Sequence, residues 1–331
     1  MIYTELVMIV MGISLVLYTL LGGADFGAGI IELFIGDKAN STVSRAMAPV
    51  WEANHMWLII AVVILFNGFP KAYTVLSTNL HIPVLLFLVA IILRGTAFTF
   101  RHYDAYQDGS QKLYSYIFRF SSIMAVFFLG VTVSAFFSGT IPIDMSGGFA
   151  HLYIFPWLNY FNLFVGVFMV VLSAYIGAAF LLGEVKTTAE YRTLEKFCVF
   201  LFLATVVLGL FVFLIAYNDN LVFFNLFLSN PFSITFVVIA TLLIPLVFWL
   251  IKKKQIWGLR FMVGIQIVLI LAGWFVIQWP NLVFYADGSV LSMYDAAGPE
   301  ITMKILFVAL AVGVVVIFPG LWYLFRVFKG N

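Results

Sequence analysis

The chain has 331 residues, of which 64% are hydrophobic and only 10% are charged. Soluble domains carry about 25% charged residues, so this composition excludes a soluble globular protein and indicates a polytopic membrane protein. The net charge of +2 provides no basic footprint for nucleic acid. The single cysteine, Cys198, has no partner in the chain for a disulfide.

Nine apolar stretches are long enough for a membrane-crossing helix, which takes about 20 residues. Lipid offers no partners for backbone groups, and long runs without alternation exclude a barrel, so the predicted fold class is all-α. The predicted spans cover residues 4–34, 51–70, 81–101, 114–139, 158–183, 195–217, 231–251, 258–278 and 301–327.

Lysine and arginine are distributed unevenly between the two sides that nine spans create. If the N-terminus lies outside, 15 of the 17 basic residues fall on inner loops or inner helix ends, and only Lys71 and Lys304 fall outside. The positive-inside rule therefore predicts an outer N-terminus and a cytoplasmic C-terminus.

The first stretch contains Asp25 in the glycine-rich run 22–29. A carboxylate in hydrocarbon costs a few kcal/mol, and acids kept there commonly serve as proton relays. Asp25 lies about 14 Å from the inner end of its helix, and Glu32 follows at i+7 on the same face. The pattern predicts a proton wire with Glu32 at its mouth and Asp25 inside. A structural hydrogen bond or salt bridge between helices is the alternative for Asp25.

The second stretch opens with a dense polar and aromatic cluster that contains Trp51, Glu52, Asn54, His55 and Trp57. Glu52 and His55 are spaced i, i+3 and therefore point to one side of a helix. An acid near a helix N-terminus is also favoured by the helix dipole alone. The spacing supports a channel entry and a plain interfacial anchor equally.

The third stretch ends with two arginines, Arg94 and Arg101. We expect Arg101 to extend its charged end toward the lipid headgroups. Arg94 lies one heptad deeper, about 10 Å further in, and needs a carboxylate, backbone carbonyls or an anionic group. The predicted partner is Asp25 or Glu52, which approach from the same leaflet.

Residues 24–28 in the first span and 174–178 in the fifth share a pattern of small residues, with Tyr175 in place of Asp25. The match suggests two parallel four-helix halves and a ninth helix, but small residues recur wherever helices pack closely. The corresponding domains are residues 1–140 and 141–280, each a four-helix bundle, and residues 281–331, an outer loop with a peripheral helix.

None of the four histidines falls at mid-depth on a facing pair of predicted helices, so we expect no haem ligated by this chain. The sequence contains no phosphate loop, dinucleotide fingerprint, metal motif or nucleophile elbow. We therefore expect no metal site and no catalytic residue in this chain itself.

Together these clusters resemble subunit II of the cytochrome bd-type quinol oxidases over nearly the whole chain. The matching positions are the acidic run 23–29, then Pro49, Trp51, Glu52, Asn54 and Trp57, then Phe69, Pro70 and Tyr73, and finally Arg94, Phe100 and Arg101. Many relatives carry Asp and Gly where this chain has Glu52 and Ala53. Glutamate keeps the acid and reaches one methylene further.

The resemblance implies a nine-helix subunit of two four-helix bundles and one peripheral helix, in a bacterial cytoplasmic (inner) membrane. Its partner, subunit I, carries haems b and d and the quinol site, and the complex reduces oxygen to water with protons from the cytoplasm. Membrane lipid and a small accessory subunit are further candidate partners. Some members hold a structural quinone in subunit II, which makes a bound quinone a candidate cofactor.

In the family, acids that match Asp25 and Glu52 line a proposed proton channel toward the oxygen-reducing haem. Glu32, His55, Trp57 and Arg94 are further candidates for this path.

Two other functions remain open. A proton-coupled secondary transporter would also use buried acids and broken helices. Its matching halves would be expected to share the acid, and Tyr175 counts against this. A purely structural subunit would use Asp25 and Glu52 only to hold helices together.

Overall fold

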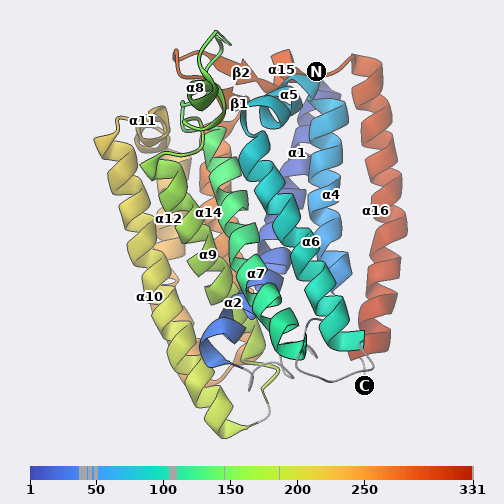
Figure 1. Ribbon diagram of the computed structural model, residues 1–331, viewed down its shortest axis with the longest axis vertical. Coiled ribbons are helices and arrows are strands. Elements are labelled where there is room, and N and C mark those ends of the chain that lie inside the picture. Colours follow the sequence, from blue (N-terminus) through green and yellow to red (C-terminus); the bar gives the residue numbers. More distant parts are fainter. Residues whose placement is uncertain are drawn as a thin grey trace.

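The computed structural model describes residues 1–36, 43, 47, 51–103, 110–144, 146–185 and 187–329. Most of these residues lie in helices that run side by side along the long axis of the molecule (Figure 1). The helices of the first part are α1 (Ile2–Leu17), the π-helix η1 (Tyr18–Gly22), α2 (Gly23–Ile35), α4 (Trp51–Gly68), α5 (Pro70–Asn79), α6 (His81–Tyr103) and α7 (Ser110–Ala135). The remaining elements are α8 (Phe149–Tyr153), α9 (Tyr160–Leu181), α10 (Thr188–Asn218), α11 (Val222–Ser229), α12 (Pro231–Leu242), α13 (Ile244–Lys253), α14 (Ile256–Gln278), β1 (Asn281–Phe284), β2 (Val290–Ser292), α15 (Met293–Ala296) and α16 (Glu300–Lys329).

Eight apolar helical runs within the described residues are long enough to cross a membrane, and a bent pair of helices forms a ninth candidate. The bent pair is α4 with α5, which meet at an angle of 110°. Pro70 begins α5, where a proline is well accommodated but cannot continue the preceding helix. The 18 residues of α4 extend about 27 Å, so α4 covers most of a bilayer core before the bend. The predicted all-α polytopic membrane fold is confirmed.

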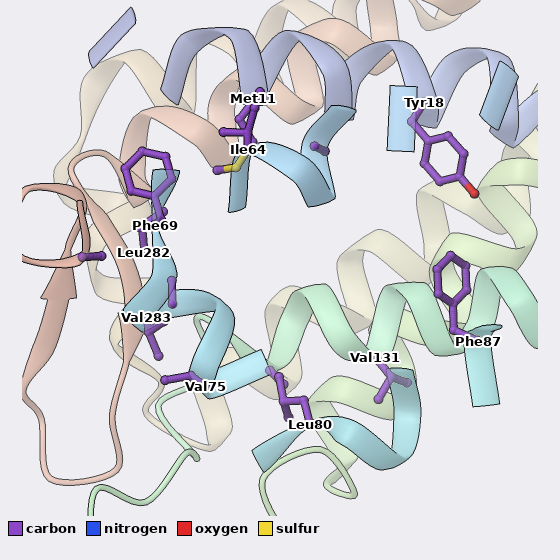
Figure 2. Close-up of a cluster of buried hydrophobic side chains, with 14 of the residues drawn as sticks. Met11, Tyr18, Ile64, Phe69, Val75, Leu80, Phe87, Val131, Leu282 and Val283 are labelled. Carbon is purple, nitrogen blue, oxygen red and sulfur yellow. The ribbon is translucent and has the colours of Figure 1, made fainter. Parts of the chain in front are cut away.

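The two ends of the molecule differ in what covers them (Figure 1). The N-terminus, α5, α8, α11, α15 and the antiparallel hairpin β1–β2 gather at one end. Beneath them, Phe69 is fully buried at the bend and lies in an apolar cluster with Val75, Leu282 and Val283 (Figure 2). At the opposite end, α2 and α6 finish and α7 and α10 begin, at Ile35, Tyr103, Ser110 and Thr188. We call it the basic end, because the sequence predicts most of the lysines and arginines on this side. The charge bias predicts that the basic end faces the cytoplasm.

Helices α2 and α9 cross at two glycines that occupy matching positions of the internal pattern. A Cβ added at Gly27 would overlap the backbone carbonyl oxygen of Ser173, and one added at Gly177 would lie 2.5 Å from the backbone carbon of Gly27. Such close backbone approach is the usual reason for small residues in membrane helices. Close packing therefore suffices to explain why glycine recurs at both positions.

Helix α16 lies on the outside of the molecule, next to α1 and α4 (Figure 1). Its apolar side chains are largely exposed, among them Val308, Val312 and Val315. This arrangement is that of a peripheral helix. The chain segments that we expect to form the two bundles are joined by extensive packing of α2 and α7 against α9, so their boundaries at residues 140 and 280 stay a prediction.

We predict that Gly27→Ala destabilises the protein, because α2 and α9 must separate to admit the new methyl group. Overpacking of this kind costs typically about 1–3 kcal/mol. Gly264→Ala in α14 is the matched control, since a Cβ at Gly264 has nothing within 4 Å. The midpoint of thermal unfolding in detergent should fall for Gly27→Ala and stay within error for Gly264→Ala. Equal midpoints for the two variants would contradict the crossing.

Candidate functional site

Asp25 and Arg94 form a buried ion pair between α2 and α6. Asp25 is 3% exposed and Arg94 is 2% exposed. The Nη2 of Arg94 lies 3.3 Å from Oδ2 of Asp25 and donates a hydrogen bond of 3.0 Å to the backbone oxygen of the same residue. Its Nε donates to Oγ of Ser122 in α7 at 3.1 Å. Arg94 therefore links three helices, and Asp25 is the carboxylate that compensates its charge.

The aromatic rings of Phe26 and Phe118 enclose the Arg94 guanidinium. Its central carbon lies 4.7 Å from the ring centre of Phe26 and 5.1 Å from that of Phe118. A cation over an aromatic face is stabilised by the ring quadrupole, more so where water is excluded. The apolar sequence around Asp25 thus supplies part of the environment that tolerates the charge.

His55 approaches the other side of Asp25 from α4. Its Nε2 lies 3.9 Å from Oδ2 of Asp25, and its Nδ1 lies 3.5 Å from the hydroxyl oxygen of Tyr18. Trp57 is buried in the apolar cluster that also contains Tyr18 and Phe26. Glu52 lies in the first turn of α4, but its side chain falls outside the described part of the structure.

Glu32 lies fully buried between two arginines near the basic end. Its Oε1 accepts hydrogen bonds from Nη1 of Arg101 at 2.7 Å and from Nε of Arg119 at 3.0 Å. The expectation that Arg101 extends toward headgroups is wrong, because its side chain is 3% exposed and paired with Glu32. Glu32 thus connects α2 to an arginine of α6 and an arginine of α7.

The two charge clusters repeat with the same spacing on two helices. Asp25 and Glu32 are seven residues apart in α2, and Arg94 and Arg101 are seven residues apart in α6. Seven residues are close to two helical turns, so each pair keeps one face and lies about 10 Å apart along the axis. Figure 1 shows that α2 and α6 both run toward the basic end. The first acid therefore pairs with the first arginine and the second acid with the second arginine.

Sequence reasoning missed three participants, Tyr18, Ser122 and Arg119. Tyr18 stands seven residues before Asp25, but the π-helix η1 lies between them, so regular heptad spacing does not predict that the two share a face. Arg119 lies within a predicted span and could have been flagged as an intramembrane charge. Ser122 gives no sequence signal, because serine is common in membrane helices.

No group of three or more His, Cys, Asp or Glu side chains that could hold a metal ion occurs among the residues the structure describes. His55 is directed at Asp25 and Tyr18, and Nδ1 of His81 contacts the backbone oxygen of Thr78. The side chain of His102 lies outside the described residues.

In the second half of the chain, a largely apolar cavity of about 200 Å³ is lined by residues of α9, α10, α12, α13 and α14. Tyr175, at the position that matches Asp25, lines it and donates a hydrogen bond to Oε1 of Gln266 at 3.3 Å. Nε2 of Gln266 in turn donates to the backbone oxygen of Ala240 at 3.2 Å. The position of the buried acid in one half thus corresponds to a neutral polar pair in the other.

The sequence model of the family described as cytochrome bd terminal oxidase subunit II matches residues 3–328. The chain belongs to this family. Similar proteins include the cytochrome bd ubiquinol oxidase subunit 2 of Bacillus subtilis, 25% identical over 92% of this chain and 89% of the relative. A putative cytochrome bd menaquinol oxidase subunit II of the same organism is 24% identical over 94% of this chain and 91% of the relative.

The fold is similar to a chain in the structure of the bd oxidase from Geobacillus thermodenitrificans, with a TM-score of 0.80, 19% identity and full coverage of both chains. The resemblance drawn from the sequence motifs is confirmed. This subunit II is a multi-pass membrane protein and part of a terminal oxidase complex, in which it has a partner subunit I and contributes to oxidoreductase activity. Family membership decides against the transporter alternative.

We predict that Arg94→Gln strongly destabilises the subunit, because it leaves the Asp25 carboxylate buried without a counter-charge. Removing one partner of a buried ion pair costs about 3–5 kcal/mol. The double variant Asp25→Asn with Arg94→Gln should recover much of the lost stability, since it buries no unpaired charge. Yield and thermal midpoint of the purified complex measure both effects. A double variant no better than Arg94→Gln would contradict the pairing.

Proposed function

We propose that this subunit supplies a scaffold and a proton path, which leads from the cytoplasm through Asp25 toward the oxygen-reducing site in subunit I. In this proposal the haems and the quinol site belong to subunit I, and the basic end of subunit II faces the cytoplasm of a bacterium. One observation carries the proposal. Asp25 is almost fully buried, and its Oδ2 faces Arg94 at 3.3 Å and His55 at 3.9 Å. Its Oδ1 has no hydrogen-bond partner within the described residues and can take a proton.

Glu32 offers a contrast on the same helix. One of its oxygens accepts hydrogen bonds from Arg101 in α6 and Arg119 in α7. A carboxylate held by arginines of two other helices links α2 to both of them. We therefore assign Glu32 an anchoring role, although the sequence makes it a candidate for the proton path.

The proposed route enters along α4 instead. The i, i+3 spacing of Glu52 and His55 in the sequence predicts that they share a side of that helix. In the structure, Nε2 of His55 lies 3.9 Å from Oδ2 of Asp25. Glu52 would act as the entry, His55 as the intermediate and Asp25 as the inner relay. Trp57 would shape the apolar wall beside them, and Arg94 would fix the position of the carboxylate.

We predict that Asp25→Asn in the assembled complex slows quinol-driven oxygen consumption by about 100-fold or more, the range for losing a positioned proton-transfer group. The amide is nearly the same size but cannot accept a proton. The haem absorbance spectrum should be unchanged. Asp144→Asn, an exposed carboxylate at the opposite end, is the control and should leave the rate unchanged.

Two outcomes would count against the relay. A normal rate with intact haems would exclude Asp25 as a required carrier. Loss of haem and of subunit I from the purified variant would instead favour the purely structural alternative.

The cavity beside Tyr175 supports a second proposal, that it holds a long hydrocarbon chain from a quinone tail or a lipid. Its hydroxyl groups are engaged inside the chain, Tyr175 with Gln266 and the two lining threonines with backbone oxygens of their own helices. Few donors remain for the carbonyl oxygens of a quinone ring, while the apolar lining suits an isoprenoid or acyl chain. The residues present therefore fit a tail better than a head group.

We predict that Gly209→Leu reduces the amount of quinone or lipid that copurifies with the complex. Gly209 lines the cavity, and a Cβ there makes ordinary contact with Phe168 at 3.5 Å, so leucine extends into the space without a clash. Extraction followed by mass spectrometry would distinguish a quinone from a phospholipid. Unchanged contents of both would contradict the proposal.

A further inference from the structure

The first membrane helix contains one irregular turn, and it lies directly before Asp25. Tyr18–Gly22 form the π-helix η1 between α1 and α2. Single π-turns inside α-helices shift the facing of side chains and occur frequently at functional sites. The ring of Tyr18 lies over Gly22, where an added Cβ would be 2.8 Å from a ring carbon. Glycine at this position thus makes room for the ring.

The two nitrogens of the His55 ring face different oxygens. Nδ1 lies 3.5 Å from the hydroxyl oxygen of Tyr18, and Nε2 lies 3.9 Å from Oδ2 of Asp25. Phe26 packs edge-on against the imidazole with ring centres 5.6 Å apart, and the Tyr18 ring lies 5.9 Å away. Tyr18 itself is 2% exposed. An aromatic cage thus holds the imidazole between a hydroxyl and a carboxylate.

This arrangement assigns a different role to each nitrogen. In a neutral imidazole, the nitrogen that donates a hydrogen bond carries the proton, and the other nitrogen is then free to accept one. If Nδ1–H donates to the Tyr18 oxygen, Nε2 is the nitrogen that faces Asp25. One proton can then move between Nε2 and Oδ2: imidazolium with carboxylate becomes neutral imidazole with carboxylic acid. No other bond changes, and Tyr18 keeps its own proton throughout.

We infer that Tyr18 is a positioning residue of the proton path, which holds the His55 ring so that Nε2 exchanges a proton with Asp25. The inference rests on the proposed path and adds to it a residue that no sequence motif marked. The π-turn positions the Tyr18 hydroxyl, and the lack of a side chain at Gly22 leaves room for the Tyr18 ring. Among the described residues, the charged or titratable side chains placed in contact with this set are Asp25, His55 and Arg94.

The test uses Tyr18→Phe in the complete complex, because phenylalanine keeps the ring packing and removes only the hydroxyl. Tyr3→Phe in α1 is the matched control, since Tyr3 also packs against a phenylalanine ring but lies far from Asp25 in the sequence. Gly22→Ala is a second variant that displaces the ring by a different route. For each variant, the rate of oxygen consumption is measured in H₂O and in D₂O, and the haem content is determined. Asp25→Asn is measured in parallel in the same way.

We expect Tyr18→Phe to retain its haems and to turn over about 10-fold more slowly, a smaller loss than the removal of a proton-transfer group itself, which costs about 100-fold or more. Its solvent isotope effect should exceed that of the parent complex, because proton delivery then limits the rate. Gly22→Ala should show the same change, and Tyr3→Phe should behave as the parent.

Three results would overturn the inference. A parental rate and isotope effect for Tyr18→Phe, with Asp25→Asn slow, would remove Tyr18 and leave the path standing. Parental values for both variants would remove the path as well. Loss of haem or of subunit I from Tyr18→Phe would show that the hydroxyl serves assembly.

Discussion

A carboxylate in the interior of a membrane bundle requires a compensating charge close by, and in this subunit the Asp25–Arg94 pair meets that requirement. Arg94 cannot lose its proton, so its charge is permanent and must itself be compensated. It reaches the side chain and the backbone of Asp25 and also Ser122, and so ties α6 to α2 and α7. One guanidinium group thus adds a polar link between helices that also pack as the pairs α6–α7 and α2–α7.

The second charge cluster, around Glu32, combines the same kinds of side chain in a different arrangement. Around Glu32, two arginines from different helices donate hydrogen bonds to one carboxylate oxygen. Around Asp25, one arginine lies 3.3 Å from Oδ2, and Oδ1 has no hydrogen-bond partner within the described residues. This difference is the reason why we propose that Glu32 holds helices together and that Asp25 exchanges a proton.

The two halves of the chain differ in their interiors although they meet at matching glycines. Gly27 and Gly177 bring α2 and α9 into backbone contact, and two residues before each glycine stands Asp25 in one half and Tyr175 in the other. In the first half the interior contains the Asp25–Arg94 ion pair. In the second half it contains a neutral Tyr175–Gln266 pair beside an apolar cavity. This difference separates the region we propose for protons from the region we propose for a hydrocarbon chain.

Sequence patterns alone were enough to predict the membrane class, the approximate limits of the spans and the family, and to mark Asp25 and Arg94 as intramembrane charges that need partners. These follow from composition, apolar length and charges inside apolar runs, all of which are local properties of the chain. The sequence also narrowed the partner of Arg94 to two acids, because both lie in the same leaflet.

The packing of the helices was needed to show that Arg94 pairs with Asp25, that Arg101 turns inward to Glu32, and that Tyr18 and Ser122 lie at the site. These outcomes depend on how α2, α4, α6 and α7 rotate and pack against one another, and a one-dimensional pattern does not specify rotation. The π-turn before Asp25 is the plainest case: it changes the facing of Tyr18 within an unbroken apolar run, where the sequence gives no sign of an irregular turn.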